Sequence, residues 1–370
     1  MSKKGLFGLA SKAGDVAAIN WYPGHMASAT KAIRERIKVV DLVVEVRDAR
    51  IPLSSANSEF QDLLERKKRL IVCNKMDLAN PNMTLKWESH FQKLNQRLVF
   101  VNAHQTKSVR KMLEVAWDLL REKLAKEPTL LLMIVGIPNV GKSALINTLF
   151  RHAHAIAKSE QEHLKKAKVG PLPGVTQHIS GFKVPAEFYS LVTSCVHIRL
   201  KSNLMMLRVL CGFSQIGEKP SVYVLDTPGV LVPNIDNIDT GLKLALTGAV
   251  KDSVVGEERV ARYLLSVLNA RSSHLRWTPE LSQAECDTSE IGANVRNVIA
   301  QTCLKFDGNL EDKDDMESLV DEQMITIRRI FKVPSEVGDD GWIRVSKQLL
   351  KLFRTGRLGR FTLDPVPVMT

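Results

Sequence analysis

The sequence predicts an α/β domain followed by a mainly helical C-terminal domain, and three observations support this prediction. From Trp21 to about Leu124, short apolar runs alternate with amphipathic stretches, as expected for a parallel sheet covered by helices. A further apolar run ends in a glycine-rich loop near Gly136, which is typical of a strand leading into a phosphate-binding turn. Beyond about Pro233, apolar residues recur at helical intervals and strand-like runs become scarce.

Five strands and several helices follow from this pattern. Buried parallel strands are predicted at Val39 to Val46, Leu70 to Cys73, Leu98 to Val101, Leu130 to Val135 and Val222 to Leu225, each a short apolar run. Asn80 followed by Pro81 predicts a capped helix start. The stretch from Val109 to Leu124 predicts an amphipathic helix.

Bulk composition narrows the classes of function. The chain has 370 residues, a mass of 41.3 kDa and a formal net charge of +12, which favours polyanionic partners such as RNA. Its five cysteines are far apart with no C-x-x-C pair, so neither a disulfide framework nor a zinc site is expected. No apolar run reaches the roughly 18 residues of a membrane span, so a soluble or peripheral protein is expected.

The glycine-rich loop from Gly136 to Ser143 has the pattern G-x-x-x-x-G-K-S. Because it lies between a predicted strand and a predicted helix, it indicates a P-loop whose backbone N–H groups surround phosphates. Lys142 is expected to neutralise the β and γ phosphates, and Ser143 to bind Mg²⁺. The predicted contacts in this loop also include Asn139, Val140, Gly141 and Ala144.

Two downstream segments complete the predicted phosphate site. Asp226-Thr227-Pro228-Gly229 follows the strand at Val222 to Leu225, so Asp226 can hold Mg²⁺ through water and the Gly229 N–H can reach the γ-phosphate. Thr176 lies in a Gly- and Pro-rich loop, where it can reach Mg²⁺ only when a γ-phosphate is present. An ordinary turn threonine is the alternative.

The base-reading element lies upstream of the P-loop. Asn74-Lys75-Met76-Asp77 follows the strand at Leu70 to Cys73, and its aspartate can accept the two adjacent N–H groups of guanine, which adenine lacks. Asn102-Ala103 follows the next strand, where a second base-contacting loop is expected. The motif order is therefore permuted, although all these loops can still meet at the carboxyl edge of one sheet. In this order the Mg²⁺-sensing segments run directly into the C-terminal domain, so we expect loss of the γ-phosphate to re-aim that domain.

These motifs resemble those of the circularly permuted GTPases of the YlqF type, over about residues 20 to 360. The resemblance also rests on the segments 21–27, 48–52 and 240–245, which read WYPGHMA, DARIP and TGLKLA. It implies a GTPase that binds the large ribosomal subunit late in assembly, with the C-terminal domain contacting rRNA and no role for DNA. For mitochondrial members it implies peripheral attachment to the matrix side of the inner membrane.

The resemblance also implies two roles in hydrolysis. Val230 stands where conventional GTPases place a water-orienting glutamine, and the family assigns that task to the histidine of its P-G-H-M segment, here His25. Packing beside the sheet is the alternative for His25. Asn139 matches a position that helps coordinate K⁺ in related GTPases that lack the glutamine, so slow intrinsic hydrolysis raised by K⁺ and by the ribosome is expected.

The predicted organisation has three parts. Residues 1–20 are basic with helical apolar spacing, which is typical either of a mitochondrial presequence or of a frayed basic terminus. Residues 21–235 are expected to form the GTPase domain and 236–370 the helical domain. Within the latter, 307–322 is acidic and 342–370 is basic, which suggests a nucleic-acid surface or simply solvated faces.

Residues 185–216 depart from the family pattern as an insertion. From Phe188 to Gln215 they contain no acidic residue and many apolar ones, so they are either a membrane-surface segment or a translated unspliced stretch that packs poorly. Because the insertion separates Thr176 from Asp226, we expect it to impair GTP hydrolysis more than nucleotide binding. Two rival functions remain open: a non-hydrolysing, GTP-gated RNA scaffold, and a ribosome-assembly GTPase of another compartment.

Overall fold

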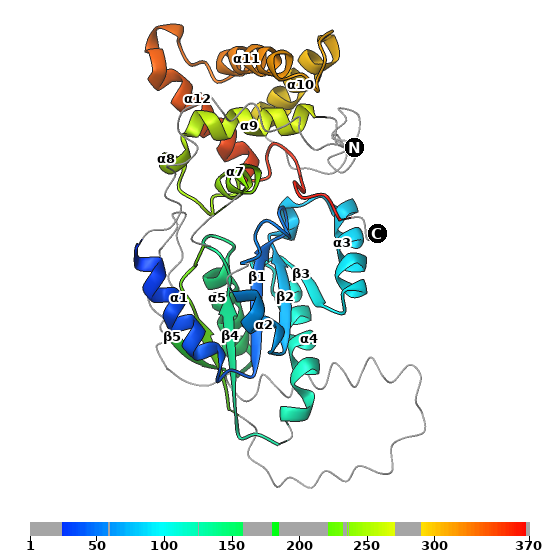
Figure 1. The fold of residues 1–370 in the computed structure, drawn as a ribbon, viewed down its shortest axis with the longest axis vertical. Coiled ribbons are helices and arrows are strands. Elements are labelled where there is room, and N and C mark those ends of the chain that lie inside the picture. Colours follow the sequence, from blue (N-terminus) through cyan, green and yellow to red (C-terminus); the bar gives the residue numbers. More distant parts are fainter. Residues whose placement is uncertain are drawn as a thin grey trace.

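The computed structural model describes residues 24–57, 60–124, 126–157, 180–184, 221–231, 235, 237–270 and 290–367. The segment 1–20, Thr176 and the insertion 185–216 lie outside these residues. The described chain forms a sheet with helices on both faces and a helical region beyond one end of the sheet (Figure 1). This architecture confirms the predicted fold class.

The sheet has six strands in the order β3-β2-β1-β4-β6-β5. The five strands β1 to β4 and β6 pair in parallel, and β5 adds an antiparallel edge next to β6. The bounds are β1 Leu42–Asp48, β2 Arg69–Asn74, β3 Arg97–Val101, β4 Thr129–Val135, β5 Ser180–Val184 and β6 Ser221–Asp226. The β4–β1–β2 arrangement places the ends of the P-loop strand and the base-reading strand at one edge.

The predicted start of the first strand was wrong. Val39 belongs to a turn, because its N–H donates to the carbonyl of Arg36 at 3.1 Å, and its side chain is 65% exposed. Asp41 is the first residue to contact β4, because its N–H donates to the Leu131 carbonyl at 2.9 Å and its carboxylate accepts the Leu131 N–H at 2.9 Å. Strand β1 itself begins at Leu42. The apolar run therefore began before the strand it predicted.

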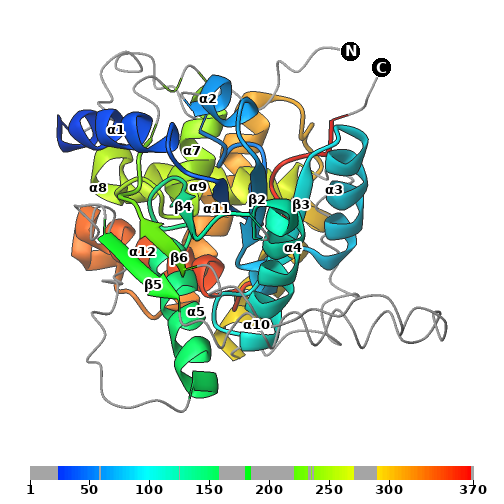
Figure 2. The same cartoon turned by 90° about the horizontal axis from the view of Figure 1, so that it is seen from below.

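Helices cover both faces of the sheet (Figure 2). Helices α1 (Gly24–Ile37) and α2 (Gln61–Glu65) lie on one face, while α4 (Thr106–Leu124) and α5 (Lys142–Ala157) lie on the other. Helix α3 (Pro81–Lys93) packs near the β3 edge. Its predicted cap is confirmed, since the Asn80 side chain accepts the Asn82 N–H at 3.0 Å.

The C-terminal region is helical, as predicted. Its described helices are α7 (Ile238–Leu246), α8 (Asp252–Val255), α9 (Glu257–Asn269), α10 (Glu290–Lys305), α11 (Lys313–Ile330) and α12 (Gly338–Arg354). The side chains of Asn269 and Gln323 form a reciprocal buried amide pair that ties α9 to α11. None of the helices in the described ranges has the length and apolarity needed to cross a bilayer.

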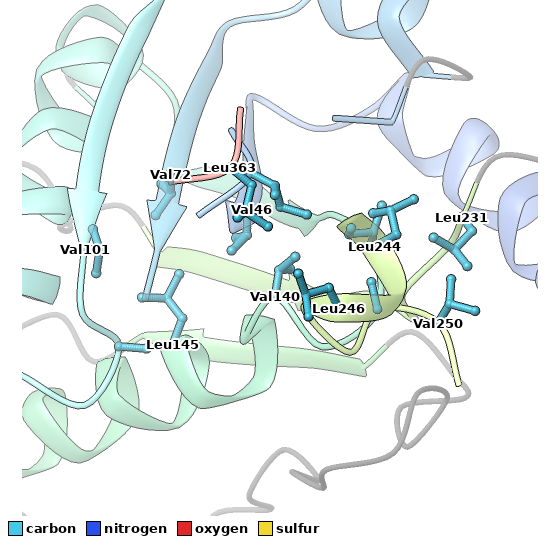
Figure 3. Packing of buried hydrophobic residues seen from close by; sticks show 14 of the residues in the cluster. Val46, Val72, Val101, Val140, Leu145, Leu231, Leu244, Leu246, Val250 and Leu363 are labelled. Carbon is cyan, nitrogen blue, oxygen red and sulfur yellow. The ribbon is translucent and has the colours of Figure 1, made fainter. Parts of the chain in front are cut away.

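One hydrophobic core joins the helical region to the sheet. Leu244 and Leu246 of α7 lie against Val46 and Val140 at the end of the sheet (Figure 3). After α12 the chain returns to the first domain, where the Leu363 N–H donates to the Arg50 carbonyl at 2.7 Å. The tail of the predicted segment 236–370 thus packs on the α/β domain, and the domain boundary itself stays a prediction.

Candidate nucleotide site

The loop after β4 has the close backbone packing of a phosphate-binding turn. Gly136 and Gly141 have φ values of +152° and +96°, which side chains rarely adopt. A Cβ atom on Gly136 would lie 2.3 Å from the Val46 carbonyl oxygen, and one on Gly141 would lie 2.3 Å from Nδ2 of Asn74. Because α5 starts at Lys142, the N-terminal end of that helix faces the loop.

Lys142 is buried at the centre of this loop. Its Nζ donates to the carbonyls of Gly136 and Ile137 at 3.1 and 2.9 Å. Burial lowers the pKa of Lys142 to about 8, against the opposing attraction of the Asp226 carboxylate. A polyphosphate placed beside this amine would raise its pKa again, because a nearby negative charge favours the ammonium form.

We expect the lowered pKa of Lys142 to make nucleotide binding dependent on pH. Above about pH 8 the free protein holds Lys142 increasingly neutral, whereas bound phosphates favour the ammonium form. We therefore expect GDP affinity to fall between about pH 7 and about pH 9 and binding to take up protons at the higher pH. Calorimetry in buffers of different ionisation enthalpy measures this uptake. Lys142→Arg should remove this uptake, and no proton uptake at the higher pH would show that the amine is already charged in the free protein.

Ser143 and Asp226 fit the residues that hold Mg²⁺ in this class of site. Ser143 Oγ donates to Oδ2 of Asp226 at 3.2 Å. Oδ1 of Asp226 is buried and has no hydrogen-bond partner among the described residues. Burial raises the pKa of this carboxyl, against the lowering influence of Lys142 and Ser143, so a divalent cation would relieve the cost of its charge. Thr176, the third predicted contributor, lies outside the described residues.

The segment after Asp226 packs directly on the P-loop. A Cβ atom on Gly229 would lie 2.5 Å from Cα of Pro138. Val230 is 1% exposed, and its N–H donates to the Gly136 carbonyl at 3.4 Å. Its apolar side chain offers no group that orients water.

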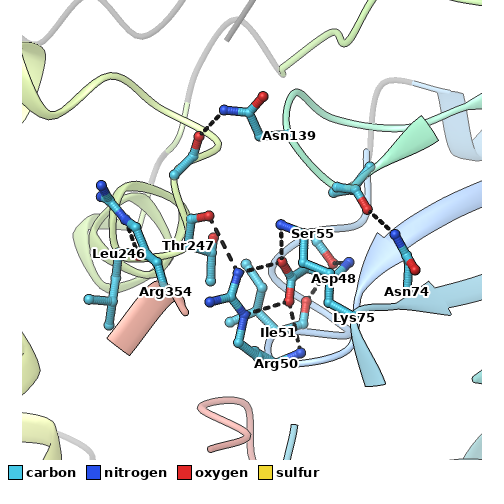
Figure 4. A network of polar contacts seen from close by, with 12 residues as sticks. Asp48, Arg50, Ile51, Ser55, Asn74, Lys75, Asn139, Leu246, Thr247 and Arg354 are labelled. Atoms are coloured by element: carbon cyan, nitrogen blue, oxygen red, sulfur yellow. Dashed lines mark hydrogen bonds and ion pairs between the residues drawn. The ribbon is translucent and has the colours of Figure 1, made fainter. Parts of the chain in front are cut away.

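Asn74 connects three of the predicted loops. Its Nδ2 donates to the Val140 carbonyl at 2.8 Å, and its Oδ1 accepts the Ala103 N–H at 2.9 Å. The bond from Asn74 to the P-loop is shown in Figure 4. The asparagine of the predicted base-reading motif thus holds the P-loop and the Asn102-Ala103 loop together. The permuted order therefore brings these loops to one place, as the sequence indicated.

A cavity of about 260 Å³ opens between these loops. Its lining includes Lys75, Asp77, Asn102, Gly141 and Ala144. Asp77 is exposed and lies in a short helical turn, Met76–Leu78, that follows the left-handed Lys75 at φ 61°. An exposed carboxylate at the wall of a cavity this size suits the N–H edge of a guanine base.

A buried ion-pair network at the wall of the cavity has no counterpart among the roles assigned from the sequence. Asp48 accepts Nε and Nη2 of Arg50 at 2.9 and 2.8 Å and pairs with Nζ of Lys75 at 3.1 Å (Figure 4). Burial would raise the pKa of Asp48, but the charges of Arg50 and Lys75 and the bonds from Arg50 hold it well below the usual range. The only signal was that Asp48 and Arg50 lie in a family segment.

The remaining predicted residues have mixed outcomes. Met76 is 38% exposed beside the cavity. Asn139 Nδ2 donates to the Gly248 carbonyl at 2.8 Å, so this residue bridges the P-loop and the helical region; its K⁺ role stays a prediction. His25 falls in the first turn of α1, and only its backbone belongs to the described structure.

Comparisons with known proteins agree with this geometry. The sequence model of a family described as "50S ribosome-binding GTPase" matches residues 131–295. The chain is 45% identical to "Short integuments 2, mitochondrial" of Arabidopsis thaliana, with 99% of this chain and 94% of that protein covered. It is 33% identical to "Mitochondrial ribosome-associated GTPase 1" of Mus musculus, with 95% and 90% covered.

Two further matches extend the comparison to bacteria. "Ribosome biogenesis GTPase A" of Bacillus pumilus is 31% identical, with 74% of this chain and 83% of that protein covered. The crystal structure of GNP-bound YlqF from T. maritima matches with a TM-score of 0.53 at 20% identity, covering 92% of this chain and all of that one. The chain therefore belongs to the circularly permuted GTPases of the YlqF type and is an enzyme that binds guanine nucleotide and hydrolyses GTP.

Proposed function

We propose that this GTPase acts in mitochondria, in the late assembly of the large ribosomal subunit. The observation that carries the proposal is the 33% identity, over 95% of the chain, to a protein named "Mitochondrial ribosome-associated GTPase 1". The Arabidopsis relative at 45% identity is also named as mitochondrial. The net charge of +12 suits an rRNA partner. Peripheral attachment to the matrix side of the inner membrane is part of the proposal and rests on the family resemblance.

We assign the nucleotide contacts as follows. Asp77 reads the base, Asn74 and Ala103 hold the base loops, and Lys142 neutralises phosphate charge. Ser143 and Asp226 serve Mg²⁺, Ser143 directly and Asp226 through water, with Thr176 joining when a γ-phosphate is present. The remaining contacts come from the P-loop and base-loop residues Lys75, Met76, Asn102, Asn139, Val140, Gly141 and Ala144 and from the Gly229 N–H.

The hydrolytic water needs an organiser other than residue 230. Val230 is buried and apolar, and the family places a histidine in that role. We propose His25 for it, and K⁺ held by Asn139 for the charge that develops between the phosphates. The divalent ion supplies Lewis-acid stabilisation of the same phosphates.

The γ-phosphate signal has a short path to the helical region. The segment from Asp226 to Leu231 leads from β6 toward α7, and Asn57 Nδ2 donates to the Val230 carbonyl at 2.9 Å. Leu231 lies near Val250 in the shared core (Figure 3). A rearrangement at Gly229 would therefore shift Leu231 and its packing against the helical region.

Steady-state turnover with purified mitochondrial large subunits tests the proposal. We expect slow hydrolysis alone and at least about tenfold faster hydrolysis with subunits and K⁺. His25→Ala should remove most of the stimulated rate with unchanged GDP affinity, and Na⁺ should not replace K⁺.

The rival functions predict different results. GTP-dependent subunit binding without turnover would identify a scaffold. Stimulation by cytosolic but not mitochondrial subunits, with no mitochondrial signal when the full chain is imaged beside a variant lacking residues 1–20, would move the protein to another compartment.

A further inference from the structure

The nucleotide cavity has a wall from the helical region. Besides the base and phosphate loops, its lining includes Thr247, directly after α7, and Arg354, the last residue of α12. Both are about a hundred residues or more beyond the P-loop in sequence. Neither residue belongs to the motifs from which the nucleotide contacts were predicted.

This wall is held in place by a dense set of polar contacts. Arg354 donates from Nε to the Leu246 carbonyl at 3.0 Å and from Nη2 to the Ala245 carbonyl at 2.8 Å. Its guanidinium also forms a two-bond ion pair with Asp252, with Nη1 donating to Oδ2 at 2.8 Å. Arg354 thereby ties the end of α12 to the last turn of α7 and to the start of α8.

The α/β domain contacts the same turn from the other side. Arg50 donates from Nη2 to the Thr247 carbonyl at 3.4 Å (Figure 4). Its guanidinium lies 5.4 Å from the ring centre of Phe353. Asn139 of the P-loop donates to the carbonyl of Gly248. Arg50 and the P-loop also line the cavity, so its two sides are connected through this turn.

The lining indicates which part of a nucleotide the wall would touch. Asp77, Asn102 and Ala103 belong to the base-reading loops, and the lining does not include Lys142, Ser143 or Asp226. The cavity therefore corresponds to the part of the site that would hold the base and sugar of a guanine nucleotide. The γ-phosphate would lie outside it, beside Lys142, Ser143 and Asp226.

We infer that Thr247 and Arg354 form part of the nucleotide site and contact the nucleoside half of the bound guanine nucleotide, with the Arg354–Asp252 pair positioning this wall. The helical region then responds to any bound guanine nucleotide, whether or not it carries a γ-phosphate. This response is separate from any response to the γ-phosphate itself. The inference rests on the nucleotide site proposed above. It predicts that GMP, GDP and a GTP analogue all engage the wall.

Affinities of the full-length protein for GMP, GDP and a non-hydrolysable GTP analogue, measured by calorimetry, test the inference. Arg354→Gln keeps a polar side chain but loses the ion pair and the fork of donors. We expect it to lower all three affinities by about the same factor, roughly tenfold. Asp252→Asn, which leaves the arginine but loosens it, should lower them by about threefold.

Two controls separate a contribution at the cavity from general damage. Arg262 is another arginine of the helical region that pairs with carboxylates, and it does not line the cavity. Arg262→Gln should therefore leave all three nucleotide affinities unchanged. Asp364→Asn weakens a different contact between the two regions, where Asp364 accepts the N–H groups of Leu53 and Ser54 at 2.9 and 2.8 Å. An equal loss in Asp364→Asn and Arg354→Gln would overturn the inference, because loosening alone would then explain it.

Hydrogen exchange of residues 245–248 and 352–356 gives a readout that does not depend on substitution. GMP should protect these residues as strongly as GDP does. Protection by the GTP analogue alone, or unchanged affinity in Arg354→Gln, would refute the wall while leaving the nucleotide site intact. If Asp77→Asn also had no effect on affinity, the proposed nucleotide site itself would be the failure.

Discussion

Asp77→Asn is expected to lower GDP affinity by about 10²- to 10³-fold, since two charge-assisted hydrogen bonds to the base are lost and one N–H of guanine then faces an amide N–H. The aspartate is exposed at the cavity wall and follows the left-handed Lys75, whose backbone sets the turn. The substitution therefore removes recognition and leaves the local fold in place. Calorimetric titration with GDP and ADP measures the change.

A base that matches the amide provides the positive control. Xanthine carries a carbonyl where guanine carries its amino group, so xanthosine diphosphate should bind Asp77→Asn better than it binds the unmodified protein. Asp118→Asn, on the exposed face of α4, is the matched surface control and should bind GDP normally. Unfolding of Asp77→Asn without nucleotide should differ by less than about 0.5 kcal/mol. Retained guanine selectivity in Asp77→Asn would show that the base binds elsewhere.

The loops that meet at the cavity could be predicted because each follows a buried strand with its own pattern. The Asn74 to Asp77 element begins at the last residue of β2, and Gly136 to Ser143 follows β4. Parallel strands bring such loops to one edge whatever their order in the chain. The spacing of Gly136 and Gly141 and the following Lys142 were sufficient to predict a phosphate-binding loop. The first residue of a strand was harder to predict, because an apolar run does not mark where hydrogen bonding to the neighbouring strand begins. Val39 is an example, since β1 starts at Leu42.

The contributions of the helical region could not be predicted. Thr247 and Arg354 line the cavity, and the Gly248 carbonyl meets the P-loop, only because α7 and α12 pack beyond the end of the sheet. No periodicity or motif spacing around these residues indicates that contact. The same holds for the return of the tail at Leu363. Contacts between residues far apart in sequence depend on packing that a linear pattern does not encode.

The network around Asp48 should contribute strongly to stability. Asp48 and Arg50 each expose 2% of their side chains, and Nη1 of Arg50 is already buried without a partner among the described residues. Asp48→Asn would leave the buried guanidinium without the carboxylate that accepts its two hydrogen bonds. We expect a loss of about 3–5 kcal/mol in the free energy of unfolding, measured by urea denaturation without nucleotide.

The pH dependence of this effect follows from the direction of the pKa shift. Because the pKa of Asp48 is depressed in the native protein, its contribution is complete above the ordinary carboxyl pKa of about 3.9 and is lost only as the pH falls through the native value. The difference between Asp48→Asn and the unmodified protein should therefore be constant from about pH 6 to about pH 8.

Paired substitutions separate the missing charge partner from other damage. Asp48→Asn combined with Arg50→Met removes both charges and keeps an apolar chain beside Phe353, so it should recover part of the lost stability. Breaking the exposed Arg121–Asp118 pair, whose side chains are 72% and 50% exposed, should cost less than about 1 kcal/mol. If the double variant were as unstable as Asp48→Asn alone, the loss would come from the cavity and the loop rather than from an uncompensated charge.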